Sequence, residues 1–160
     1  MTLRSRLNIA LVAGFCTLSL SAVAAAQQPH IVLGDSVNWG PAPPSLPLGA
    51  RAAVLMGDPG KPGPFVLRLK FPEGYVVPPH RHSKEEHVTV ISGGFAFGLG
   101  EKLDRAAKAL PPGSFVRIPS DTIHWAFAAG ETVVQINGVG PFDVGYANPS
   151  DDPQKQIKTQ

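Results

Sequence analysis

The stretch GYVVPPHRHSKEEHVTVISG, residues 74–93, decides the fold of this chain. It contains two histidines separated by one residue, His80 and His82, and a glutamate a few residues later, Glu86. A third histidine, His124, follows in a later segment that is also rich in glycine and proline. Three imidazoles and one carboxylate suit a borderline divalent metal, because they bind the ion without cancelling all of its charge. The sequence therefore predicts one metal site.

The spacing of these residues fits strands better than a helix. Successive side chains of a strand point to opposite faces, so His80 and His82 share a face, and Glu86 rejoins them after a short turn at Ser83-Lys84. His124 must then come from a distant strand. Glycines and prolines surround each of these segments, which places the corners of the chain beside the proposed ligands.

Residues 74–93 and 113–128 resemble the paired motifs of the cupin superfamily. The first motif matches at every defining position, whereas the second has Asp121 and Ala128 where the usual pattern has glycine and asparagine. The resemblance implies a small antiparallel β-barrel with a central metal, whose ligands would be His80, His82, Glu86 and His124. The flanks also resemble a group of exported bacterial single-domain cupins, through Trp39-Gly40-Pro41, Gly57-Asp58-Pro59, Gly140-Pro141-Phe142 and Asp151-Asp152-Pro153.

Residues 1–26 have the pattern of an export signal. Arg4 and Arg6 precede an apolar run over residues 7–20, and Ala24-Ala25-Ala26 offers a cleavage site before Gln27. The run is shorter than the roughly 20 apolar residues of a membrane span, so we expect cleavage and no stable membrane anchor. Because the arginines are not a twin pair, we expect a Sec-type signal and a periplasmic or secreted protein.

The composition after the leader excludes some partners. The whole chain has 14 basic and 12 acidic residues, and the leader accounts for two of the basic ones, so the remainder has no net charge. No basic stripe remains to bind nucleic acid or an anionic membrane. The single cysteine, Cys16, also lies in the leader, so stability must come from the core and the metal rather than from disulfides.

The apolar pattern predicts an all-β fold of the small antiparallel barrel, or jelly-roll, type. After an extended Pro-rich arm over residues 27–50, short apolar runs separated by turn residues continue through a barrel at 51–146, and a polar tail follows at 147–160. The only helical candidate is the segment 101–110, which we expect to form one short helix between the two motifs. No internal repeat and no second domain is evident.

The neighbour of Glu86, His87, stands at a spacing that would also reach the ion. Alternation favours Glu86, because an inward Glu86 places Val88 and Val90 inward as well. His87 is then a second-layer or surface group, although its role as a replacing or additional ligand stays open. Other candidates for the pocket are Gln135, Asn137 and Tyr75, and the candidates for holding an anionic substrate are Arg68 and Arg117.

Four protein ligands leave one or two coordination positions open, so we predict a mononuclear metal-dependent enzyme acting on a small organic molecule. The resemblance favours a dioxygenase-type oxidoreductase, with Glu86 as a ligand or as the catalytic group that takes a proton. Isomerase, lyase and hydrolase chemistry stay open, and so does the ion among iron, manganese, nickel, copper and zinc. The alternative is a non-catalytic metal or small-molecule binding protein. The resemblance also implies a homodimer.

Overall fold

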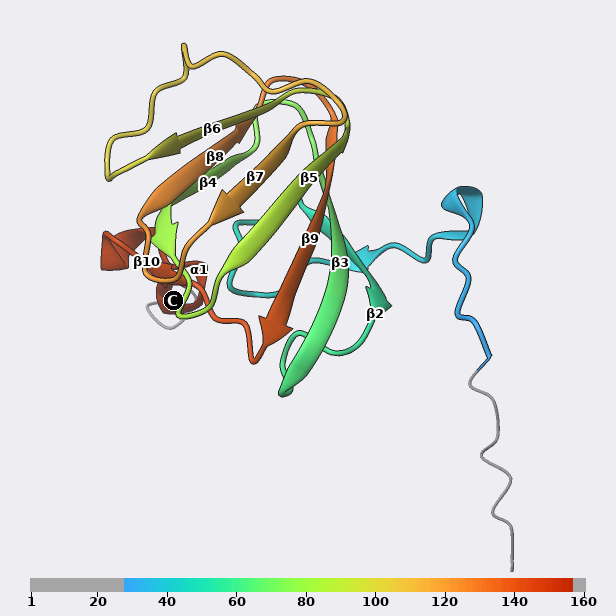
Figure 1. Cartoon of the computed structure of the whole chain (residues 1–160). Helices are drawn as coiled ribbons and strands as arrows, with labels where there is room; N and C mark the ends of the chain where they lie inside the picture. Colours follow the sequence, from blue (N-terminus) through green and yellow to red (C-terminus); the bar gives the residue numbers. More distant parts are fainter. Residues whose placement is uncertain (1–27, 157–160) are drawn as a thin grey trace, which may run out of the picture. The chain divides into compact units, whose positions relative to one another are not determined.

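The computed structural model describes residues 28–156, and their regular structure is almost entirely β (Figure 1). Residues 28–31 hold no helix or strand, and residues 32–156 belong to one compact unit, to which the following account applies. The export signal predicted at residues 1–26 lies outside the described residues. Within residues 28–156, no helix has the length and apolar character needed to cross a membrane.

The strands form two antiparallel sheets, with the orders β1-β2-β3-β9-β5-β7 and β10-β4-β8-β6. The larger sheet consists of β1 (Gly40–Pro41), β2 (Arg51–Met56), β3 (Gly63–Phe71), β5 (Glu86–Ser92), β7 (Phe115–Ile118) and β9 (Thr132–Gly140). The smaller sheet consists of β4 (Val76–Arg81), β6 (Phe95–Leu99), β8 (His124–Ala128) and β10 (Gly145–Tyr146). Three short helical turns are η1 (Gly34–Ser36), η2 (Pro149–Asp151) and α1 (Pro153–Gln156).

The core lies between the inner faces of the two sheets. β3 alternates strictly, with its odd-numbered residues from Phe65 to Phe71 buried, and it pairs along its whole length with β9. From the smaller sheet, Val77, Phe95 and Ala126 pack into the same cluster. The all-β, antiparallel prediction is therefore confirmed.

The helix predicted at residues 101–110 does not form, and this prediction was wrong. The Asp104 carboxylate accepts a hydrogen bond from the Ala106 N–H at 2.9 Å, which closes a turn instead. Leu110 exchanges backbone hydrogen bonds with Phe95 at 3.2 and 2.9 Å, so the end of the segment is extended. So short a segment gains too little from its own hydrogen bonds to nucleate a helix against these competing contacts.

A bulge in β4 sets the direction of its histidine. Val77 pairs with Ala126 and His80 pairs with His124, so β4 uses one more residue than β8 over the same distance. The extra residue falls within Pro78-Pro79, whose nitrogens have no hydrogen to contribute to a ladder. The bulge shifts the alternation by one residue, and consequently both Val77 and His80 are buried.

Residues 43–47 belong to the predicted N-terminal arm, and we call this segment the strap. A turn in the strap is closed by a hydrogen bond from the Leu46 N–H to the Pro43 carbonyl at 3.0 Å. The Tyr75 hydroxyl donates to the Pro47 carbonyl at 2.6 Å, and the Tyr146 hydroxyl donates to the Ser45 carbonyl at 2.7 Å. The strap is thus fixed to its own barrel from two sides.

On the outer face of the smaller sheet, the packing of Trp125 depends on the glycine at position 98. Trp125 of β8 is only 3 % exposed and pairs with Gly98 of β6. A Cβ atom at position 98 would lie 2.1 Å from the Trp125 Cζ2 atom, which is far inside the contact distance. The close packing of the indole ring against β6 therefore requires a residue without a side chain.

We expect Gly98→Ala to lower the free energy of unfolding by about 1–3 kcal/mol, because the added methyl group must displace the Trp125 ring. The matched control is Gly130→Ala, since no atom lies within 4 Å of a Cβ at that position. Urea denaturation of the metal-free proteins, followed by tryptophan fluorescence, gives the two values. Equal losses in the two variants would contradict the packing argument.

Candidate metal centre

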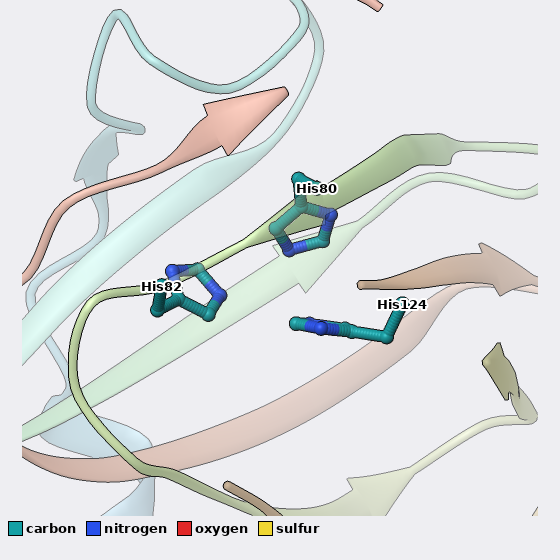
Figure 2. Close-up of side chains that lie close together, drawn as sticks. All are labelled: His80, His82 and His124. Carbon is teal, nitrogen blue, oxygen red and sulfur yellow. The ribbon is translucent and has the colours of Figure 1, made fainter. Parts of the chain in front are cut away.

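Three buried histidines converge between the sheets. His80 comes from β4, His82 follows that strand directly, and His124 begins β8. Each is 5 % exposed or less, and one ring nitrogen of each lies within 4.8 Å of the corresponding atoms of the others. Figure 2 shows the three rings facing a common space. We call these residues, together with Glu86, the ligand cluster.

The tautomer of each histidine follows from its backbone partner. Every Nδ1 atom lies at hydrogen-bond distance from a carbonyl oxygen, and because a carbonyl only accepts, each Nδ1 must carry the proton. The Nε2 lone pairs are then left for the space between the rings, which is the arrangement seen in metal-binding histidines. The partners are Pro78 for His80 at 2.7 Å, Asp143 for His82 at 2.5 Å, and Thr122 for His124 at 2.9 Å.

Glu86 reaches the cluster from β5 of the other sheet and is 5 % exposed. Its Oε2 atom lies 3.3 Å from the Nε2 atom of His82 and 3.4 Å from that of His124. With both Nδ1 atoms protonated, these contacts bring lone pairs together and become favourable only with a proton or a cation between them. The His82 Nε2 atom is buried and lacks a hydrogen-bond partner in the described part of the chain. The residues present therefore fit a divalent metal ion.

The charge state of the cluster agrees with this fit. Burial, helped by the neighbouring imidazoles, lowers the pKa of His80 to about 3, so this ring is neutral at physiological pH. Burial disfavours the ionised form of Glu86, but the contacts from His124 and His82 outweigh it and lower its pKa to about 2. Burial also disfavours charged His82, yet the Glu86 carboxylate raises its pKa overall. A cation held by these residues would face the Glu86 carboxylate and would replace the proton that this carboxylate favours on His82.

His87 lies outside the ligand cluster. Glu86, Val88 and Val90 alternate inward along β5, and the His87 side chain is 39 % exposed on the other face. Its Nε2 atom lies 2.7 Å from the Glu85 carboxylate, which also binds Arg117. The structure thus places neither His87 nor Arg117 where it would touch the ion.

The polar residues of β9 are also directed away from the cluster. Val134 and Ile136 fill the inner face, so Gln135 and Asn137 project outward. The Arg68 Nε atom donates to the Gln135 side-chain oxygen at 3.2 Å, and the Gln135 amide lies 3.4 Å from the Asn137 side-chain oxygen. Gln135 and Asn137, which were candidates for either the pocket or an exposed face, therefore lie on the exposed face: alternation within a sheet covered on one side places them on its outer surface.

Tyr75 has a different position from the one expected. It is buried, stacks on Phe71 with ring centroids 4.9 Å apart, and donates its hydroxyl hydrogen to the strap. It therefore holds a segment near the site and is not part of the cavity lining itself.

The segment after β9 also belongs to the site, although no residue role was predicted for it from the sequence. The Phe142 ring stacks on His82, with centroids 4.3 Å apart and an angle of 21° between the planes. The backbone of Asp143 orients His82, and its carboxylate accepts hydrogen bonds from the Ser83 N–H at 3.0 Å and from the Ser83 hydroxyl. The only signal in the sequence was the likeness of Gly140-Pro141-Phe142 to the exported cupins, which carried no residue role.

Asp121, which replaces the usual glycine of the second motif, keeps the backbone conformation that a glycine would adopt there. Asp121 stands where a glycine is usual and has a φ of 59°, a left-handed conformation that aspartate adopts more readily than most residues. Its N–H donates to the His82 carbonyl at 2.8 Å. The turn before His124 is thus tied to the segment that carries another histidine of the cluster.

The ligand cluster forms part of the wall of a cavity of about 100 Å³. Apart from the cluster and Ser45 of the strap, the lining side chains within residues 28–156 are apolar, and no lysine or arginine is among them. The apolar members are Pro43, Leu46, Pro59, Leu67, Leu69, Phe71, Val77, Val88, Phe95, Ile118, Ala126, Val134, Ile136, Phe142 and Val144. The ion site therefore faces an apolar pocket, as small-molecule sites commonly do.

Comparison with known proteins identifies the domain. Residues 67–139 match the family model of the cupin domain, and this chain therefore carries a cupin domain. The match includes the whole ligand cluster and both predicted motifs. No curated protein sequence matches the chain.

Solved structures share the fold. The polyketide cyclase RemF from Streptomyces resistomycificus superposes with a TM-score of 0.65 at 18% identity, over 82% of this chain and 94% of that one. An acetylacetone dioxygenase from Acinetobacter johnsonii gives 0.60 at 14% identity, over 84% and 88%. The DMSP lyase DddQ from Ruegeria pomeroyi DSS-3 gives 0.56 at 20% identity, over 72% and 64%. At these identities the likeness establishes the cupin jelly-roll fold alone.

We expect His82→Ala to weaken binding of a divalent ion by more than about a hundredfold. The loss should exceed the roughly 10- to 100-fold that follows when a residue that only hydrogen-bonds to a metal ligand is removed. His87→Ala is the matched control, because its side chain lies close in sequence but on the outer face. Titration of zinc into each metal-free protein against a competing chelator measures both affinities. Equal affinity in His82→Ala and wild type would contradict the assignment of the cluster.

Asp143→Ala removes the carboxylate that binds Ser83 but leaves the carbonyl that orients His82. Because this carbonyl then belongs to a less restrained segment, we expect the affinity for zinc to fall by about tenfold. The same competition titration measures it, with circular dichroism to confirm that the fold is kept. An unchanged affinity would show that backbone packing alone positions the carbonyl.

Proposed function

We propose that this protein is an exported metalloenzyme of the oxygenase type, which binds one divalent ion and acts on a small organic molecule. A single observation carries the proposal: three imidazoles and a carboxylate converge on the wall of an apolar cavity. An ion held there has protein ligands on one side and the cavity on the other. Open coordination toward a pocket is the feature that distinguishes catalytic from structural metal sites.

The position of His87 supports the same reading. As a further ligand it would occupy a coordination position and count against catalysis, but it is bonded to Glu85 on the outer face. The ligand cluster therefore leaves the cavity side free for a substrate or dioxygen. A redox-active divalent ion would supply Lewis acidity and electron transfer to dioxygen at this place.

The residues of the chain would act on the bound molecule in separate ways. The backbone carbonyls keep each histidine in the tautomer that a metal requires. The apolar lining excludes water from the reacting group and so strengthens electrostatic contacts within the cavity. Among the described lining residues Glu86 is the only carboxylate, so it is the residue placed to accept a proton from a substrate.

The solved structures with this fold show only which reactions the fold can support. Their names include an acetylacetone dioxygenase, a lyase and a polyketide cyclase, so one fold carries several chemistries. We favour dioxygenase chemistry because the cluster combines nitrogen ligands, one carboxylate and open coordination, a set that suits redox-active ions. Export of an unfolded chain, as the leader suggests, would expose the site to copper and zinc, which outrank iron and manganese for nitrogen-rich sites.

The decisive experiment is metal analysis of the protein purified from the periplasm of its native host, combined with oxygen uptake on a panel of small diketones, phenols and thiols. We expect about one redox-active ion per chain and oxygen consumption with at least one compound, both lost in His82→Ala and kept in His87→Ala. Stoichiometric zinc without turnover would instead indicate a binding or hydrolytic protein. A metal-free wild-type protein would overturn the metalloprotein proposal.

A further inference from the structure

We propose that Leu46 of the strap sets the upper size of the ligand, and that the ligand is a metal-chelating molecule whose remaining body is small, apolar and uncharged. The inference rests on the proposed function, since it places the chelating atoms of the ligand at the ligand cluster. It adds the substrate class of that site and a residue that determines specificity.

The entrance to the cavity is identified by the exposure of its lining. Most lining side chains are buried, whereas the half-buried or exposed ones belong to only three segments: the strap, Pro59, and the segment from Phe142 to Val144. Leu46 is the largest apolar side chain that the strap contributes. It is half-buried and packs against the core cluster, so it stands between the interior and the solvent.

The position of Leu46 is fixed by the residues on either side of it. The carbonyl of Ser45 accepts from Tyr146, and the carbonyl of Pro47 accepts from Tyr75. These tyrosines come from β10 and from the turn before β4, so the two anchors lie on separate segments. The prolines of the strap further restrict its backbone. A side chain held in this way forms a wall and does not swing aside freely to admit a larger ligand.

The chemistry of the lining limits the charge of the ligand. In the part of the lining that the structure describes, the only ionisable side chains belong to the ligand cluster, and both candidate arginines, Arg68 and Arg117, lie outside the cavity. A charged group distant from the ion would be buried without a partner, which is strongly unfavourable. The volume of about 100 Å³ sets the size, because an apolar cavity of roughly 150 Å³ holds one benzene ring.

The test uses zinc-loaded protein and four hydroxamic acids, which chelate zinc through the same two oxygens and differ only in the attached group. Acetohydroxamic acid, with a methyl group, and benzohydroxamic acid, with a ring, test the size of the ligand. Succinomonohydroxamic acid, with a charged tail, and butyrohydroxamic acid, with an uncharged tail of the same length, test its charge. Calorimetry gives each affinity for wild type, for Leu46→Ala and for Leu48→Ala. Leu48 is the matched control, because it lies in the same arm but is 96% exposed and outside the cavity lining.

We expect wild type to bind acetohydroxamic acid more tightly than benzohydroxamic acid, and Leu46→Ala to bind benzohydroxamic acid at least about tenfold more tightly than wild type. Leu48→Ala should leave both affinities unchanged. The charged tail should weaken binding by at least about tenfold relative to butyrohydroxamic acid in every protein.

Zinc content, measured in the same samples, separates the two proposals. If wild type takes up no zinc, the proposed function fails. If zinc is present but Leu46→Ala leaves the preference for size unchanged, or the charged tail binds as well as the uncharged one, the assignment of the ligand class fails. Equal gains in Leu46→Ala and Leu48→Ala would show a general loosening of the arm and would also overturn the role given to Leu46.

Discussion

The structure depends on how it satisfies four metal-binding groups buried against apolar side chains. A buried polar atom without a partner costs about 1–3 kcal/mol, and an unpaired carboxylate costs more. Each histidine has half of its hydrogen-bonding capacity satisfied by a backbone carbonyl. The remaining nitrogens and the Glu86 carboxylate face one another, so this arrangement is stable only with a cation or proton in their midst. A cation held there would thus complete the core as well as the site.

Local irregularities of the backbone serve this requirement. The bulge at Pro78-Pro79 directs His80 inward and frees the Pro78 carbonyl, which then orients the same imidazole. On the other sheet, Gly138 pairs with Glu86, and a Cβ there would lie 2.9 Å from the Phe65 ring. The absence of this side chain lets Phe65 pack beside the carboxylate strand.

The predictable part of the site was the part encoded by local alternation. The spacing of His80 and His82 was enough to predict that they share a direction, because side chains along an extended chain repeat every two residues. The same alternation predicted that Glu86 points inward together with Val88 and Val90. The same rule, applied with the knowledge of which face of β9 is covered, would have placed Gln135 and Asn137 outside. A single sequence does not state which face that is.

The unpredicted parts share a physical cause, namely contacts between distant segments through backbone atoms. The carbonyl of Asp143 orients His82, but any residue supplies a carbonyl, so no residue type marks the position. The strap likewise accepts its two hydrogen bonds through carbonyls, and only the tyrosines that donate them are specified by their side chains. The helix predicted at residues 101–110 is absent for a different reason, because a local turn contact from the Asp104 carboxylate outweighed a short helical pattern.

The anchoring of the strap links the wall of the cavity to the ligand cluster itself. The Tyr146 ring lies 6.0 Å from the His80 ring, and Tyr146 pairs with His80 between β10 and β4. Tyr146, which binds the Ser45 carbonyl, therefore belongs to the same strand pair as His80 of the cluster. Because one pair of strands positions both, the sheet sets the distance between Leu46 and the ligand cluster. The size limit of the cavity and the geometry of the cluster are consequently properties of the same structural element.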